Sequence, residues 1–63
     1  MIDPKEEDVG RIVTYVPTHA RGNLNHPDCE RGVITSFNDH AVFVKYGNQV
    51  TNKGAERRDL FWD

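Results

Sequence analysis

The sequence has little of what secreted and membrane proteins depend on. It contains a single cysteine, Cys29, so no disulfide can form within the chain, and we expect a reducing compartment. No apolar run reaches the roughly 18 residues that a membrane-spanning helix needs. The acidic start, 1–8, lacks the basic and apolar regions of a secretion signal. These absences predict a soluble, cytoplasmic protein.

The sequence also has no excess of basic charge, with 8 Lys and Arg residues against 10 Asp and Glu. The net charge is -2 and the isoelectric point is near 5.8. This balance weighs against broad binding to phosphate backbones, which depends on many Lys and Arg contacts. The chain shows neither an internal repeat nor a segment with helical periodicity, and its 63 residues allow only one domain.

What the sequence does contain is β-branched and aromatic residues in three runs. The first, 9–16, reads as a strand that Pro17 ends. The second, 31–47, holds two such runs on either side of Asn38-Asp39 and predicts a β-hairpin. The third, 57–63, predicts a short final strand. Two polar connections, 18–30 and 48–56, separate these runs.

The hairpin register follows from the expected turn. If residues 38–39 form the turn, the predicted cross-strand pairs on one face are Val33–Val44, Thr35–Val42 and Phe37–His40. Ile34 and Phe43 then meet on the other face. The expected core consists of Val13, Tyr15, Val33, Val42, Val44 and Leu60, with Phe37 capping one end.

A strand, a long loop, a hairpin, a short loop and a final strand are the parts of a strongly bent small barrel. We therefore predict an all-β fold, a small SH3-like (Tudor-like) barrel of about five strands with a long loop after the first. Residues 9–63 form this single domain. Residues 1–8 are expected to be a flexible acidic lead-in.

Several stretches of the sequence together carry a resemblance. They are Gly10-x-x-Val13-x-Tyr15-Val16-Pro17-x-His19-Ala20-x-Gly22, His26-Pro27-Asp28-Cys29-Glu30-x-Gly32-Val33, and Val42-Phe43-Val44-Lys45-Tyr46 with a late Asp59-Leu60. This pattern resembles a group of small uncharacterised proteins encoded by phages and prophages, and it covers most of 10–60. The resemblance implies a viral or prophage origin and action in the host cell cytoplasm. It implies no activity.

The segment 19–30 is the richest in chemically reactive side chains. His19, His26 and Cys29 are weak candidates for a metal site, because structural zinc sites usually show paired short spacings and His26-x-x-Cys29 supplies only half of one. The simpler interpretation is a tight turn at 26–28 with Cys29 packed as a small hydrophobe. We predict no metal ion and no cofactor. We also predict no enzyme, because a chain this short can hardly supply a nucleophile, a base, an oxyanion hole and a cleft.

Aromatic side chains are the better candidates for binding. Tyr15, Tyr46 and Trp62 could line a groove of the kind that small barrels use for proline-rich segments, methylated side chains or bases. Alternatively, the two tyrosines belong to the core with their hydroxyls at its rim. Phe61 and Trp62 are adjacent on one strand, so alternation turns one of them outward unless the strand bends and both cover an open barrel end.

The resulting prediction is an interaction module, a monomer or weak homodimer, that binds a host or phage protein. The alternative is a small nucleic-acid-binding barrel, in which Arg57 and Arg58 would frame the C-terminal aromatic residues. Carboxylates at Glu30, Glu56 and Asp59 lie among the basic residues and favour a mixed surface over a basic one. The predicted partner-binding residues are Tyr15, Tyr46, Arg57, Arg58, Phe61 and Trp62.

Overall fold

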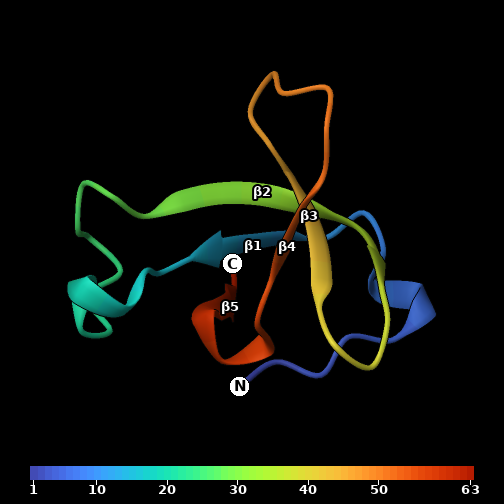
Figure 1. Ribbon diagram of the computed structural model, residues 1–63, viewed down its shortest axis with the longest axis horizontal. Helices are drawn as coiled ribbons and strands as arrows, with labels where there is room; N and C mark the ends of the chain where they lie inside the picture. Colours follow the sequence, from blue (N-terminus) through green and yellow to red (C-terminus); the bar gives the residue numbers. More distant parts are fainter.

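The computed structural model describes residues 1–63 and contains five β-strands, three short 3-10 helices and no α-helix (Figure 1). In chain order the elements are η1 (Glu6–Asp8), β1 (Ile12–Tyr15), η2 (Thr18–Ala20), β2 (Glu30–Phe37), β3 (Val42–Tyr46), β4 (Lys53–Ala55), η3 (Arg57–Asp59) and β5 (Leu60–Trp62). None of the helices has the length and apolar character needed to cross a membrane.

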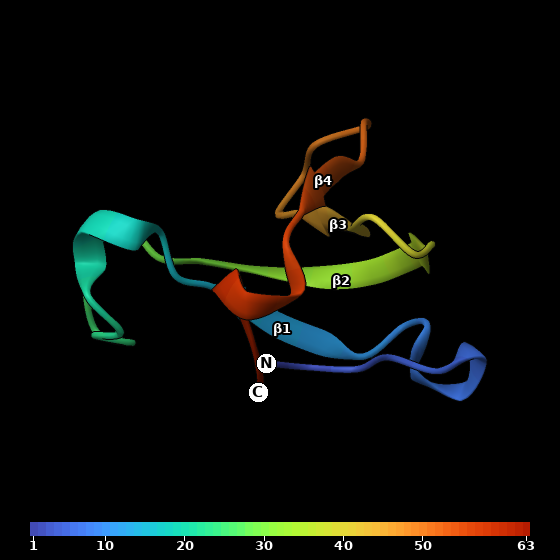
Figure 2. The same cartoon turned by 60° about the horizontal axis from the view of Figure 1, so that its bottom comes forward.

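The strands form one antiparallel sheet in the order β4-β3-β2-β1-β5. Figures 1 and 2 show β3 and β4 running steeply across β1 and β2, so the sheet is strongly bent. The two edge strands, β4 and β5, do not pair with each other. The prediction of an all-β fold is therefore confirmed, and the sheet itself is open.

A single apolar cluster fills the inner face of this bend. Its members are Ile2, Val13, Ile34, Val42, Val44, Tyr46 and Leu60, and Tyr15, Phe37, Ala55 and Trp62 pack against it. The predicted core positions Val13, Val42, Val44 and Leu60 are confirmed, each with no exposed surface. Val33 was predicted wrongly, since 39% of its surface is exposed.

The hairpin turn also differs from the prediction, but a loop longer by two residues would by itself leave Val33 on the same face as Val44. The loop between β2 and β3 contains four residues, 38–41, and not the two at 38–39 that the sequence suggested. The Asn38 side chain accepts hydrogen bonds from the backbone amides of His40 (2.8 Å) and Ala41 (2.9 Å). An asparagine that organises the turn in this way replaces the tight two-residue connection.

A β-bulge explains the exposure of Val33. The register of β2 against β3 shifts between Ile34 and Ser36, so Thr35 is the extra residue. Its hydroxyl donates to the carbonyl of Phe43 at 3.2 Å. One extra residue reverses which side chains of β2 face the core from that point on. The predicted pairs Val33–Val44, Thr35–Val42 and Phe37–His40 are replaced by Val33–Lys45, Ile34–Val44 and Phe37–Val42.

Both ends of the chain contribute to the fold. Ile2, within the expected lead-in, is 4% exposed and belongs to the core cluster. At the other end, residues 57–59 form η3, so the predicted strand over 57–63 is confined to β5. On β5 the side chains alternate as expected. Phe61 points outward with 36% of its surface exposed, and Trp62 packs against the core.

Candidate functional site

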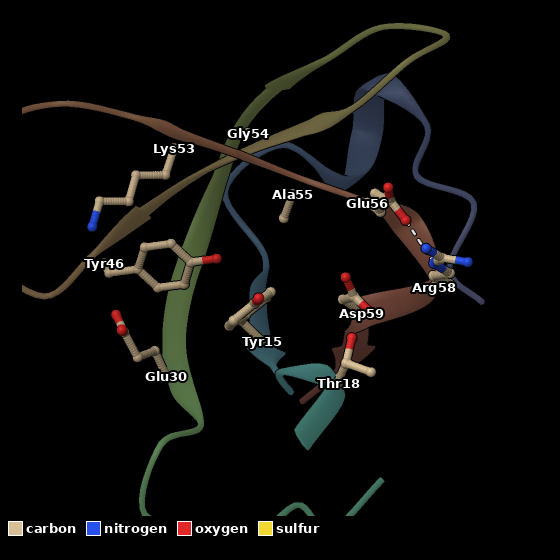
Figure 3. A pocket seen from close by; sticks show the side chains of 10 residues that line it. All are labelled: Tyr15, Thr18, Glu30, Tyr46, Lys53, Gly54, Ala55, Glu56, Arg58 and Asp59. Atoms are coloured by element: carbon tan, nitrogen blue, oxygen red, sulfur yellow. Dashed lines mark ion pairs between the residues drawn. The ribbon is translucent and has the colours of Figure 1, made fainter. Parts of the chain in front are cut away.

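A cleft of about 470 Å³ opens at one end of the inner face of the sheet. Figure 3 shows its lining, which comes from β1, β2, β3, β4, η2 and η3. The lining residues are Tyr15, Thr18, Glu30, Tyr46, Lys53, Gly54, Ala55, Glu56, Arg58 and Asp59. Because these elements are far apart in the sequence, the cleft exists only in the folded domain.

The aromatic part of the cleft is the pair Tyr15 and Tyr46. Their rings lie edge to face, with centroids 6.4 Å apart and planes inclined by 70°. This is a favoured geometry for two aromatic rings. Gly32 lies opposite Tyr46 in the β2–β3 ladder, and a side chain there would collide with the Tyr46 ring. The absence of a side chain on β2 therefore sets the position of Tyr46.

The Tyr46 hydroxyl remains protonated across the physiological range. Burial, with smaller contributions from the Glu30 carboxylate and Tyr15, raises the pKa of Tyr46 to about 12. In Figure 3 this hydroxyl points into the cleft. Tyr46 thus offers a neutral hydrogen-bond donor beside the edge of its ring.

Carboxylates flank the aromatic pair on two sides. Glu30 lies directly opposite Tyr15 in the β1–β2 ladder, and Asp59 stands across the cleft on η3 (Figure 3). Neither carboxylate has an ion-pair partner within 4.0 Å, whereas Glu56 is paired with Arg58 at 2.6 Å. Lys53, at the outer edge of the cleft, is the remaining charged residue. The cleft therefore carries a net charge of -1 from Glu30, Glu56 and Asp59 against Lys53 and Arg58.

The structure brings together some of the predicted partner-binding residues and separates others. Tyr15, Tyr46 and Arg58 line the cleft. Arg57 points elsewhere and donates to the carbonyl of Asn38 at 2.6 Å. Phe61 lies on a neighbouring shallow groove with Val16, Pro17, Thr18, Gly22, Arg58 and Asp59.

Trp62 is partly buried against the core, and Arg11 lies over its ring. The guanidinium carbon of Arg11 lies 4.1 Å from the centre of the Trp62 ring, and the same guanidinium donates to Asp8 at 3.0 Å. Hydrogen bonds from the Lys5 backbone amide and from Arg11 hold the pKa of Asp8 below its usual value. The tryptophan therefore serves packing at the edge of the core.

Of the three weak metal candidates, His19 and His26 lie together and Cys29 lies apart. His19 and His26 approach Asp28 in the long loop. Cys29 is outside this group, since its Sγ donates to the carbonyl of Asn23 at 3.3 Å. The hydrogen bond from His19 holds the pKa of Asp28 below its usual value, so the carboxylate is ionised at neutral pH.

From the sequence, Glu30 and Asp59 were expected to form part of a mixed surface and not a site, because each has basic neighbours along the chain. The informative feature would have been the pairing of Glu30 with Tyr15 across β1 and β2, which depends on the register. Comparisons with protein-family models, curated proteins and solved structures found no match to this chain. The chemistry of the site is therefore inferred from the residues of this chain.

Proposed function

We propose that this chain is a non-enzymatic binding module, phage- or prophage-encoded, that binds a basic segment of a host or phage protein in the Tyr15–Tyr46 cleft. The observation that carries this proposal is the pair of aromatic rings flanked by Glu30 and Asp59, two carboxylates without ion-pair partners. The module would act in the host cell cytoplasm, as the resemblance to phage proteins implies.

The physical basis is the attraction of a cation to an aromatic face and to nearby carboxylates. An Arg or Lys side chain over a tyrosine ring gains roughly 0.5–2 kcal/mol, more when water is excluded. Complementary charges at the edge of an interface mainly increase the association rate and the specificity. Glu30 and Asp59 lie on opposite sides of the rings, so an extended segment with two basic residues could contact both.

The same charges disfavour nucleic acid in this cleft. Carboxylates repel phosphates, and nucleic-acid affinity rises with the number of phosphates that free Lys and Arg side chains neutralise. Several arginines already have partners within the fold. Arg11 is engaged with Asp8 and Trp62, Arg31 with Asp63, Arg57 with the Asn38 carbonyl, and Arg58 with Glu56.

The SH3-like (Tudor-like) character of the fold belongs to this proposal. The long loop between β1 and β2, the bent sheet and the final strand that pairs with β1 support it. In such small barrels, loops at one end of the sheet frame a groove for an extended peptide. Here the beginning of the long loop and η3 frame the cleft in that manner.

The proposal is tested by a titration of isotope-labelled protein followed by NMR. The probes are a short peptide of alternating Arg and Gly, a matched peptide with Gln in place of Arg, and a single-stranded oligonucleotide. We expect the Arg peptide alone to shift the amide signals of Tyr15, Glu30 and Tyr46. Shifts caused only by the oligonucleotide, or confined to the outer residues Ile12 and Val33, would contradict the proposal.

A further inference from the structure

Three potential metal ligands meet in the long loop between β1 and β2. His19 Nε2 lies 2.6 Å from Asp28 Oδ2, and His26 Nδ1 lies 4.0 Å from the same oxygen. One potential ligand atom from each of the three residues falls within 4.8 Å of those of the others. The two imidazole rings stand edge to face with centroids 5.2 Å apart.

The loop backbone brings these residues together by a series of turns. Each of Ala20, Asn23, His26 and Cys29 donates its amide to the carbonyl three residues earlier, at 2.9–3.0 Å. Arg21 and Gly22 take left-handed φ angles of 52° and 78°, which fold the second half of the loop back toward His19. The three side chains therefore converge from both halves of a loop that the backbone already closes.

Core packing does not account for this convergence. The side chains of His19, His26 and Asp28 are 62%, 28% and 60% exposed. Figures 1 and 2 show the loop with η2 extending beyond the ends of β1 and β2, at the opposite end of the molecule from η1. Leu24 is 52% exposed, and within 18–29 only Ala20, at 4%, is buried. The loop brings together two imidazoles and a carboxylate.

We propose that His19, His26 and Asp28 form a binding site for one divalent transition-metal ion, with Zn²⁺ as the expected ion. Imidazole nitrogen and carboxylate oxygen are the ligands that Zn²⁺ takes at about 2.0–2.2 Å, in tetrahedral geometry that places ligand atoms about 3.4 Å apart. The distances of 2.6 and 4.0 Å from the two imidazoles to Asp28 each differ from that value by less than an ångström, and all three ligand atoms lie within 4.8 Å of one another. Side-chain rotation closes the remaining differences. A water molecule supplies the fourth ligand.

The chemical type of the ligands suits this site. His26 Nδ1 accepts a hydrogen bond from the Asp28 amide at 3.0 Å, so a metal ion bound at that nitrogen would replace this hydrogen bond. Two nitrogen ligands favour Zn²⁺ over Mg²⁺ and Ca²⁺, which prefer oxygen. Cys29 takes no part, because its thiol faces the Asn23 carbonyl. The bound ion would join the two halves of the loop and stiffen it.

The experiment measures metal binding by the full chain with four single variants. His19→Ala and Asp28→Asn remove ligands. His40→Ala removes the one histidine outside the cluster, on the β2–β3 turn, and Cys29→Ser removes the thiol. Zn²⁺ is titrated against a chelating indicator, Co²⁺ is added to record its visible spectrum, and NMR spectra confirm that each variant is folded.

We expect one Zn²⁺ per wild-type chain and the Co²⁺ spectrum of a tetrahedral site. Affinity should fall by about tenfold or more in His19→Ala and Asp28→Asn and stay unchanged in His40→Ala and Cys29→Ser. Wild type that binds no Zn²⁺ would overturn the proposal. A loss in Cys29→Ser or His40→Ala that matches the loss in Asp28→Asn would also overturn it. The result is independent of peptide binding in the Tyr15–Tyr46 cleft.

Discussion

Gly32 on β2 lies directly opposite Tyr46 on β3, and the Tyr46 ring closely covers it. A Cβ atom built on Gly32 would lie 2.5 Å from Val44 Cγ1 and 2.8 Å from both Tyr46 Cδ1 and the Lys45 carbonyl oxygen. The carbonyl belongs to the β3 backbone, so it cannot move aside without disturbing the ladder. The position of the aromatic ring in the candidate cleft therefore depends on a residue that contributes no side chain.

Gly32→Ala is expected to destabilise the domain by about 1–3 kcal/mol, the usual cost of forcing extra volume into a packed interior. Gly54→Ala on β4 is the matched control. A Cβ there would meet the Phe43 ring at 3.3 Å, and that side chain can adjust. Thermal unfolding of the two variants measures the difference. Equal and small effects would show that Tyr46 is not held against Gly32.

The bulge at Thr35 leads to a second prediction about the neighbouring core. Val44 is fully buried, whereas Val33 lies on the outer face opposite Lys45. Val44→Asp should unfold the chain, because an unpaired buried carboxylate costs several kcal/mol. Val33→Asp should change the stability by less than about 1 kcal/mol. Circular dichroism at increasing temperature compares the two variants, and an equally severe loss in both would support the register without a bulge.

Tyr46 should give the domain a characteristic alkaline behaviour. Its pKa is raised from 10.0 to about 12 mainly by burial. Below pH 10 both folded and unfolded chains keep this proton, so the stability is unaffected. Between pH 10 and 12 the unfolded chain loses the proton first, and stability falls as the pH rises. Tyrosinate absorbance and chemical denaturation of wild type and Tyr46→Phe test this, and an unaltered pH profile in the variant would contradict it.

Phe61 and Trp62 should differ in their contribution to stability. Trp62→Ala removes packing against the core and the contact with Arg11, and we expect a loss of about 1–3 kcal/mol. Phe61→Ala should cost clearly less, because its ring already contacts solvent. Denaturant unfolding ranks the two. A larger loss for Phe61→Ala would show that Phe61, and not Trp62, packs against the core.

The sequence predicted β1, β2, β3 and β5 because β-branched residues and turn residues alternate clearly there. It missed β4, since Lys53–Ala55 lies within 48–56, which was expected to be a polar connection. The hairpin, the long loop and four core positions, among them Val44, follow from that local information. The register does not follow from it. The bulge at Thr35 depends on a side-chain hydrogen bond to β3, and the four-residue loop depends on the Asn38 side chain turning toward its own backbone.

The candidate site was predictable in part. Tyr15 and Tyr46 stood out as aromatic residues at the ends of strands, whereas Glu30 acquires its role only from its place opposite Tyr15. The meeting of His19 with Asp28 arises from the successive turns of the loop, which the spacing of residues in the sequence does not encode. The sequence patterns therefore did not predict the long-range strand pairing or the closure of the long loop.

The central claim is that the cleft binds a basic segment through its aromatic pair and its unpaired carboxylates. The most direct measurement is the affinity of the alternating Arg–Gly peptide for wild type and for the double variant Glu30→Gln with Asp59→Asn, at two ionic strengths. Two charge pairs at the rim of an interface contribute about 1–2 kcal/mol together. We predict roughly tenfold weaker binding in the double variant and no change in the exposed control Glu7→Gln. Equal affinity for wild type and the double variant, at low and high salt alike, would contradict the account.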